Sequence, residues 1–278
     1  MTPPTQPTQP TRPRQPALYV PHGGGPWPFV DLGGFIPKRD IEALRAYFTA
    51  LPSTLPAPPR ALLVVSAHWE QPHPTVMTSP RPPILYDYGG FPPDAYTIQW
   101  PAPGDPALAQ RVVTLLTEAG FTPNTDATRG FDHGTFIPFK LSWPDADIPT
   151  IQLSLKSGLD PAEHLAIGRA IAPLRDEGVL ILGSGMSFHN MRGYGTATGR
   201  RDAATFDTWL TQAATAPPQQ RDTELTAWSR APAARQSHPR EEHLLPLMVV
   251  AGAAGNDVGR IAFSDDFMGT RISAVHFG

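Results

Sequence analysis

The chain has 278 residues, of which 40% are hydrophobic and 17% charged, so it can bury a substantial core. Its formal net charge of -3 and the lack of a basic run disfavour nucleic-acid binding through phosphates. The absence of cysteine excludes disulfides, thiolate zinc sites and cysteine nucleophiles, and it is compatible with a cytoplasmic location, which we expect. No apolar run reaches the roughly 18 residues of a membrane span, so we expect no membrane partner.

The first residues are rich in proline, threonine and glutamine and contain no apolar stretch of the kind found in secretory signals. Such a composition cannot bury surface, so we expect residues 1–16 to form a disordered tail. No linker-like stretch divides the remainder, and we expect residues 17–278 to form one catalytic domain.

Short runs rich in β-branched or aromatic residues predict seven strands, at 17–20, 61–67, 74–79, 97–100, 150–155, 179–184 and 271–277. The near-continuous apolar runs LLVV and VLIL are typical of central strands that are covered on both faces.

Amphipathic or apolar segments predict helices between these strands, at 40–51, 105–120, 160–178, 201–214 and 244–255. Two of them begin with Asp-Pro and end at glycine, which is typical of helix termini, and Pro173 is expected to kink one of them. Residues 215–240 are expected to form an irregular surface excursion. The alternation predicts a single α/β domain with a central, mostly parallel or mixed sheet flanked by helices on both faces.

Three histidines lie at or shortly after the ends of predicted strands: His22 in VPHGGGP, His68 in VVSAHW and His189 in SGMSFHN. Neutral imidazole is the commonest protein ligand for transition metals and the usual acid or base near pH 7. The carboxyl ends of the strands are where an α/β sheet places its active site. We therefore expect these side chains to meet at one edge of the sheet.

Two further histidines lie beside acidic residues, His133 in GFDHG and His243 in REEHLLPL. Each has a structural alternative, a tight turn for the first and an acidic helix start for the second. The stretch HPREEH has neither the HExxH nor the HxxEH spacing of zinc peptidases, and GSGMS is not a nucleophile elbow. The other histidines have ordinary structural explanations, and they are His73, His164, His238 and His276.

Taken in order, the motifs HGGGP, SAHW, GFDHG, DIPTIQLSL, GSGMSFHN and EHLLPL resemble one family. It is the class III, LigB-like extradiol ring-cleavage dioxygenases, of the DOPA 4,5-dioxygenase type found in plants and bacteria. The resemblance runs from about residue 17 to the C-terminus. Many relatives carry HGSP where this chain has HGGGP, which changes the surroundings of the first histidine but not the histidine itself.

This resemblance implies that His22, His68 and His243 are metal ligands. Related protocatechuate enzymes use two histidines and a glutamate, which makes Glu242 an alternative third ligand. Fe(II) is the metal implied for the active form, with its open positions taken by a catechol and O₂. Zn(II) is possible in purified protein, since imidazole sites bind it at least as well.

The resemblance also implies that His189 is the acid/base residue, close enough to the metal to serve as an additional ligand, and that His133 lies beside the oxygen site. The aromatic residues near the motifs are candidates for walls around a flat ring, and they are Trp27, Trp69, Phe131 and Phe188. Two other functions stay open: a zinc hydrolase with His189 or Glu242 as base, and a non-enzymatic relative that binds a metal or a partner. The expected partners of the enzyme are a small aromatic diol and O₂, and a homo-oligomer is possible.

Overall fold

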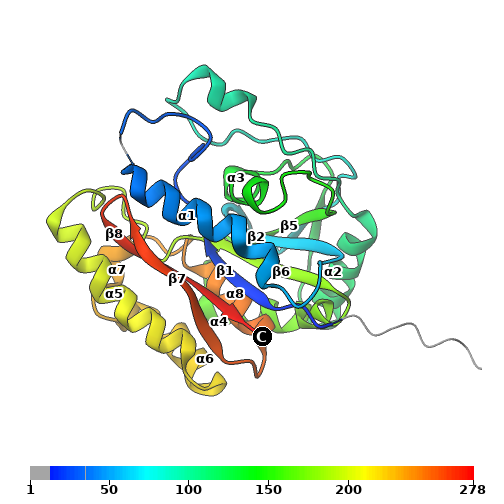
Figure 1. Ribbon diagram of the computed structural model, residues 1–278. Helices are drawn as coiled ribbons and strands as arrows, with labels where there is room; N and C mark the ends of the chain where they lie inside the picture. Colours follow the sequence, from blue (N-terminus) through cyan, green and yellow to red (C-terminus); the bar gives the residue numbers. More distant parts are fainter. Residues whose placement is uncertain (1–12, 35) are drawn as a thin grey trace, which may run out of the picture.

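The computed structural model describes residues 13–34 and 36–278, and it is organised around an eight-stranded sheet with the order β4-β3-β5-β2-β6-β1-β8-β7 (Figure 1). The strands are β1 Ala17–Pro21, β2 Ala61–Gln71, β3 Thr75–Met77, β4 Asn124–Asp126, β5 Thr150–Lys156, β6 Val179–Gly185, β7 Gly259–Phe267 and β8 Thr270–Phe277. The central strands β5, β2, β6 and β1 are parallel, whereas β8 runs antiparallel to both β1 and β7. The sheet is therefore mixed, and the predicted α/β class is confirmed.

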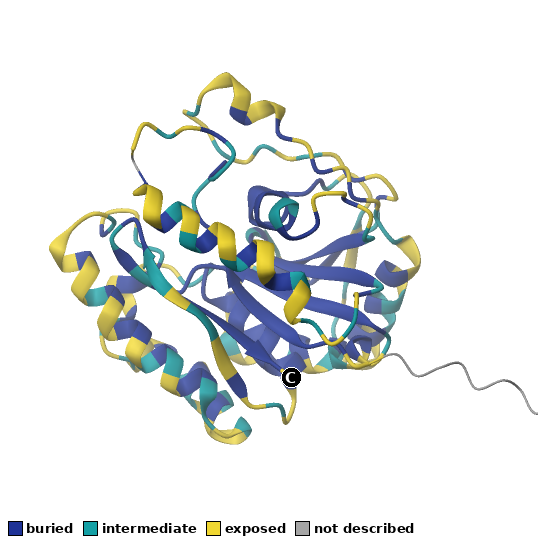
Figure 2. Cartoon of the chain, viewed as in Figure 1, coloured by how far each residue is buried: buried dark blue, intermediate teal, exposed yellow. Residues whose placement is uncertain are grey.

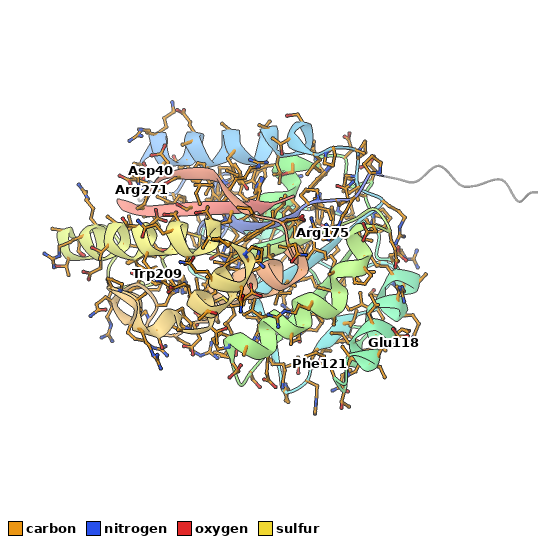
Figure 3. The ribbon with its side chains drawn as sticks, turned by 90° about the horizontal axis from the view of Figure 1, so that it is seen from below. Asp40, Glu118, Phe121, Arg175, Trp209 and Arg271 are labelled. Carbon is orange, nitrogen blue, oxygen red and sulfur yellow. The ribbon has the colours of Figure 1, made fainter. Side chains whose placement is uncertain are left out.

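Helices cover both faces of this sheet. They are α1 Lys38–Ala50, α2 Pro106–Glu118, α3 His133–Ser142, α4 Pro161–Ile171, α5 Ala197–Thr215, α6 Pro218–Thr226, α7 Ala234–Ser237 and α8 Leu245–Ala254. Four 3-10 turns lie at Leu51–Thr54, Pro93–Thr97, Ala172–Arg175 and Trp228–Arg230. The view in Figure 3 shows α1 on one side of the sheet and α4, α5 and α8 on the other. None of the helices in the described ranges is long and apolar enough to cross a bilayer.

The core lies where these layers meet, because the central strands are covered on both sides. Every residue of β1 and β6 is buried, and so is every residue of α8, which packs against α4 and the sheet. Figure 2 shows the same division, with dark central strands and a largely exposed outer face on α1. Continuous burial explains why β1, β6 and α8 read as nearly unbroken apolar runs.

The predicted helix starts at the two Asp-Pro pairs are confirmed. The Asp105 carboxylate accepts from the Leu108 N–H at 2.9 Å, and the Asp160 carboxylate accepts from the Glu163 N–H at 2.9 Å. The second of these helices ends at Ile171 and continues as a 3-10 turn over 172–175, which contains Pro173, the residue at which a kink was predicted.

Two predictions about irregular regions are wrong. Residues 97–100 are not a strand: the segment begins with the last residue of a 3-10 turn and continues as a loop, in which Trp100 is buried and its indole N–H donates to the Trp143 carbonyl at 2.8 Å. Residues 215–240 are not an irregular excursion, since they contain α6 and α7. Arg221 anchors α6 by donating to the Asp257 and Gly255 carbonyls, each at 2.9 Å.

A buried arginine joins the two ends of the described chain. Arg175 is 1% exposed and donates to the Gln15 carbonyl at 2.7 Å and the Phe277 carbonyl at 3.3 Å, while pairing with Asp257 at 2.6 Å. The Gln15 N–H donates in return to the Arg175 carbonyl at 3.0 Å. The predicted tail 1–16 is therefore too long at its C-terminal end, because Gln15 and the next residue are buried; residues 1–12 lie outside the described part of the chain.

Candidate active site

The carboxyl ends of β1 and β2 bring the first two histidines together. His22 directly follows β1, and its N–H donates to the carbonyl of Gly185 at the end of β6 at 3.0 Å. His68 lies in β2, within the stretch between Val65 and Glu70 where the register with β5 shifts. Regular pairing between β2 and β5 is therefore interrupted at the position of His68.

His243 reaches the same point from the turn before α8. Its carbonyl accepts from the Tyr19 hydroxyl at 2.9 Å and from the Met186 N–H at 3.0 Å, which ties this turn to β1 and to the end of β6. A Cβ atom on Gly185 would overlap that carbonyl, so only glycine permits the close approach.

Glycine is also required after the first histidine. Gly23 has φ +80°, and a Cβ atom there would overlap the Trp27 indole. That indole N–H donates to the His22 carbonyl at 2.6 Å, which holds the histidine backbone in place. The first glycine of HGGGP therefore has a structural role in presenting His22.

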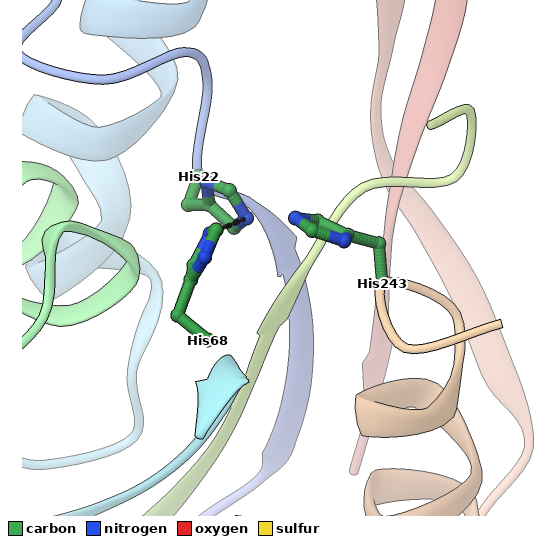
Figure 4. A group of neighbouring side chains, drawn as sticks. All are labelled: His22, His68 and His243. Carbon is green, nitrogen blue, oxygen red and sulfur yellow. Dashed lines mark hydrogen bonds between the residues drawn. The ribbon is translucent and has the colours of Figure 1, made fainter. Parts of the chain in front are cut away.

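The imidazoles of His22, His68 and His243 converge on one point, as Figure 4 shows. Their ring centroids are 4.8, 5.2 and 4.9 Å apart for the pairs 22–68, 22–243 and 68–243. Nε2 of His22 lies 3.3 Å from Nε2 of His68. Two nitrogens bound to one ion at about 2.0–2.1 Å are separated by roughly 2.9–3.4 Å, so this pair has the spacing that a shared metal requires.

The hydrogen bonding of these rings points the same way. Nε2 of His243 is buried and has no hydrogen-bonding partner among the described residues, and the same is true of Nδ1 of His22. A buried polar atom without a partner is costly, and a metal ion would satisfy the His243 nitrogen. The residues present therefore fit a metal ion.

Burial and mutual repulsion keep these imidazoles neutral. Desolvation, followed by the charges of the neighbouring histidines, holds the pKa values of His22 and His243 well below their usual range. Desolvation also lowers the pKa of His68, with a further contribution from His133. Neutral imidazole is the form that ligates a metal, so the site is ready to bind one without first losing protons.

Glu242 contacts one of the three converging histidines, His243, and also His189, and these three residues form a second group that could hold a metal ion. The Glu242 Oε1 accepts from Nδ1 of His243 at 2.9 Å and lies 3.2 Å from Nδ1 of His189. The His189 and His243 rings stack, with centroids 3.4 Å apart and 16° between their planes. Burial raises the pKa of Glu242, but the His189 hydrogen bond and the Arg240 charge outweigh it, so the net pKa is lowered and Glu242 is a carboxylate.

A second carboxylate, which the sequence analysis missed, braces the other side. His133 is the first residue of α3, and both its N–H and its Nδ1 lie 2.9 Å from Oδ1 of Asp87. The other oxygen of Asp87 is 3.6 Å from Nδ1 of His68, whose ring centroid lies 4.0 Å from that of His133. Asp87 lies in the loop sequence LYDYGG, far from every histidine motif, so only the fold reveals it.

A buried hydrogen-bond network lies beneath these rings. The Asp132 carboxylate is fully buried and accepts from Ser66, Arg129 and Gln152, each at 2.7 Å. The Ser66 hydroxyl also accepts from the His68 N–H at 3.2 Å. This network links β2, β5 and the start of α3, and it therefore fixes the backbone that carries two of the histidines.

The histidines open into a cavity of about 250 Å³. Its other walls are glycine or mostly apolar residues, namely Gly23, Gly24, Gly25, Leu32, Ile36, Phe91, Met191, Tyr194, Phe267 and Met268. None of the aromatic residues proposed from the sequence as ring walls, Trp27, Trp69, Phe131 and Phe188, lines this cavity; they are buried in the core instead. Met191 and Tyr194 follow the His189 motif closely, whereas Phe91, Phe267 and Met268 come from segments distant in sequence, so proximity to a motif identified only part of the wall.

Comparison with known proteins identifies the class. The family model for the catalytic LigB subunit of aromatic ring-opening dioxygenase matches residues 17–275. The chain is 43% identical over 205 residues to 4,5-DOPA dioxygenase extradiol of Beta vulgaris, covering 72% of this chain and 75% of that protein. It is 36% identical over 256 residues to the protein of the same name from Escherichia coli K12, covering 91% and 90%.

A solved structure agrees with these matches. The crystal structure of the uncharacterized protein JW3007 from Escherichia coli K12 superposes with a TM-score of 0.76 at 33% identity, covering 95% of this chain and 100% of that one. The chain belongs to the LigB family of aromatic ring-opening dioxygenases, as the resemblance of its motifs predicted. It is therefore a ring-cleaving enzyme that acts on an aromatic substrate with O₂.

Proposed function

We propose that this protein is a non-haem Fe(II)-dependent extradiol dioxygenase that opens the ring of a catechol-type substrate with O₂. The observation that carries the proposal is the convergence of His22, His68 and His243 at the inner end of a mostly apolar cavity, where two of the imidazoles are buried and that of His68 is half-buried. The names of two relatives refer to DOPA, which is a catechol, and this supports the choice of substrate class.

The three imidazoles would hold the metal, and their neutrality favours a deprotonated diol beside it. Fe(II) bound there supplies the redox chemistry that allows triplet O₂ to combine with a singlet catechol. The same donor set accepts Zn(II) at least as well, so a purified sample is expected to carry some zinc and to be correspondingly less active.

His189 is proposed to move protons. It lines the cavity, and its Nδ1 lies 3.2 Å from a Glu242 oxygen, so its orientation is set by a residue outside the cavity lining. We assign to it the removal of a phenolic proton from the diol and the return of that proton during ring opening. Its stacking on His243 also keeps it available as an additional metal ligand when no substrate is bound.

His133 is proposed to meet the oxygen side of the reaction. Its Nδ1 is held by Asp87, so the opposite nitrogen of the ring is left for substrate or oxygen in the cavity that His133 lines. The ring sits 4.0 Å from His68 and 5.3 Å from His22, close enough to act on a group bound between them. A hydrogen bond there would stabilise developing negative charge.

Anaerobic reconstitution with Fe(II), followed by a panel of catechols that includes DOPA, tests the proposal. We expect oxygen consumption together with a yellow, ring-opened product. Protein loaded with Zn(II) is the matched control and should bind the catechol without consuming oxygen. Stoichiometric Fe(II) binding with no oxygen uptake on any catechol would contradict the proposal and favour the non-enzymatic relative or the zinc hydrolase.

Several expectations from the sequence stay predictions. They are a single catalytic domain over 17–278, a cytoplasmic location, and the absence of nucleic-acid and membrane partners. A homo-oligomer remains compatible with the fold.

A further inference from the structure

A second hollow adjoins the active-site cavity. It has a volume of about 340 Å³ and is lined by Pro37, Met191, Tyr194, Gly195, Arg200, Met268 and Gly269. Three of these residues, Met191, Tyr194 and Met268, also line the cavity that holds the histidines. A substrate whose ring lies against the histidines therefore has room for a substituent on this side.

The walls of the second hollow are held by specific contacts. The Gly195 N–H donates to the Met268 carbonyl at 3.0 Å, which pins the loop after His189 to the hairpin between β7 and β8. The Tyr194 hydroxyl donates to the Phe188 carbonyl at 2.8 Å. Arg200 lies in the first turn of α5, and its Nη2 is 3.6 Å from the position that a Cβ atom on Gly269 would take. The arginine is thus placed by a helix against a pinned hairpin.

Apart from the histidines, the two hollows carry positive charge only. Histidines aside, Arg200 is the one charged side chain among the described residues that line either of them, and no carboxylate does so. Arg271, on the neighbouring strand β8, has an acidic partner: it lies 3.2 Å from Asp266. Among the described residues, the guanidinium of Arg200 has neither an ion pair nor a hydrogen bond, so its donors are available to a ligand. A guanidinium presents a planar pair of donors that matches a carboxylate.

We propose that the second hollow is a subsite for a side arm of the ring substrate that ends in a carboxylate, and that Arg200 binds this carboxylate. The inference rests on the proposed function and narrows its substrate class to catechols with an anionic arm. An arm that ends in an amine finds no opposite charge in these walls and is disfavoured by Arg200.

Three catechols that differ in the charge of one arm test the subsite. They are 3,4-dihydroxyphenylpropionate, 4-methylcatechol and dopamine, with anionic, neutral and cationic arms. For the Fe(II) enzyme we expect kcat/KM to fall in that order. Arg200→Gln should lower the ratio of the anionic to the neutral substrate about three- to tenfold through KM, the range for a charge-assisted contact that is partly open to solvent. Arg200→Lys should retain part of the preference.

Arg192→Gln is the matched control: Arg192 is exposed like Arg200 and lies in the loop just before α5, but it lines neither hollow, and its loss changes the net charge equally. We expect this variant to keep the wild-type ratio. Added salt should lower the ratio for wild type but not for Arg200→Gln. Dissociation constants of the three catechols for Zn(II)-loaded protein, measured under argon, should show the same charge dependence without any turnover.

The outcomes separate the two proposals. Turnover of 4-methylcatechol with no preference for the anionic substrate, or an unchanged ratio in Arg200→Gln, overturns the subsite and leaves the dioxygenase function standing. An equal loss on all three substrates would show that Arg200 only supports the fold. If wild type opened none of the three rings, the proposed function would fail and the subsite with it.

Discussion

Replacing Glu242 by glutamine tests whether this carboxylate orients the site or ligates the metal. The side chain is only 13% exposed, and its Oε1 contacts Nδ1 of both His243 and His189, at 2.9 and 3.2 Å. A hydrogen bond to a charged group contributes about 1.5–3 kcal/mol. Glutamine is isosteric and keeps one neutral acceptor, so about one such contribution is lost, which corresponds to a metal Kd weakened about 10- to 100-fold.

Competition between the protein and a chromophoric zinc chelator at neutral pH measures that Kd directly, and a parallel assay of the Fe(II) enzyme measures kcat. Glu241→Gln is the control, since the half-buried Glu241 pairs with Arg235 at 2.6 Å rather than with the histidines. We expect this neighbour to leave Kd within about twofold of wild type, as is typical of substitutions away from a site.

Two results would refute the reasoning about Glu242. A Kd that stays within twofold of wild type would show that bracing the imidazoles contributes nothing to metal binding. A complete loss of stoichiometric metal, as severe as the loss of a histidine, would instead make Glu242 a ligand, which is the alternative that the sequence left open.

Three further outcomes are expected. His68→Ala should leave metal content near zero by elemental analysis, because one of three ligands is gone; stoichiometric metal would exclude His68 as a ligand. His189→Ala should retain metal but lose about 10²-fold or more in kcat, and full ring-opening activity would contradict its acid/base role. Burial, with the Arg260 charge, lowers the pKa of His276 to about 3, so the unfolded chain takes up a proton below about pH 6.5 that the folded chain refuses. Stability should therefore fall by about 2–3 kcal/mol between about pH 6.5 and 4.5 from this group. His276→Gln should make urea unfolding less dependent on pH over that range, and an identical pH dependence would contradict this.

The central part of the fold was predictable from sequence because nearly all of its residues are buried in the apolar core. Strands β1, β2 and β6 are buried on both sides, so their apolar runs leave little choice of structure. The Asp-Pro pairs mark helix starts through a local contact that needs no tertiary information. His22, His68 and His189 were expected at one edge because parallel strands end together, and the structure brings them there.

The predictions failed where the structure of a segment depends on tertiary contacts or on partial exposure to solvent. The run 97–100 resembles a strand because Trp100 is apolar and buried, but its environment is a packed loop. The edge strand β7 was missed because half of its face is solvated and its end carries Asp265 and Asp266, which are uncommon in strands. Asp87 gave no local signal at all, since its role depends on a loop folding back over α3.

Arg175 lies at the opposite end of the sheet from the histidines. It precedes β6 and donates to the carbonyl of Phe277, the last residue of β8, which pairs with Ala17, the first residue of β1. A short peptide linker from Gly278 back to residue 13 would therefore run along the end of the sheet that is remote from the histidines. New termini opened at an exposed surface turn elsewhere should yield a circularly permuted chain with its pocket intact. The order of the elements along the chain can therefore be changed without moving the residues that form the site.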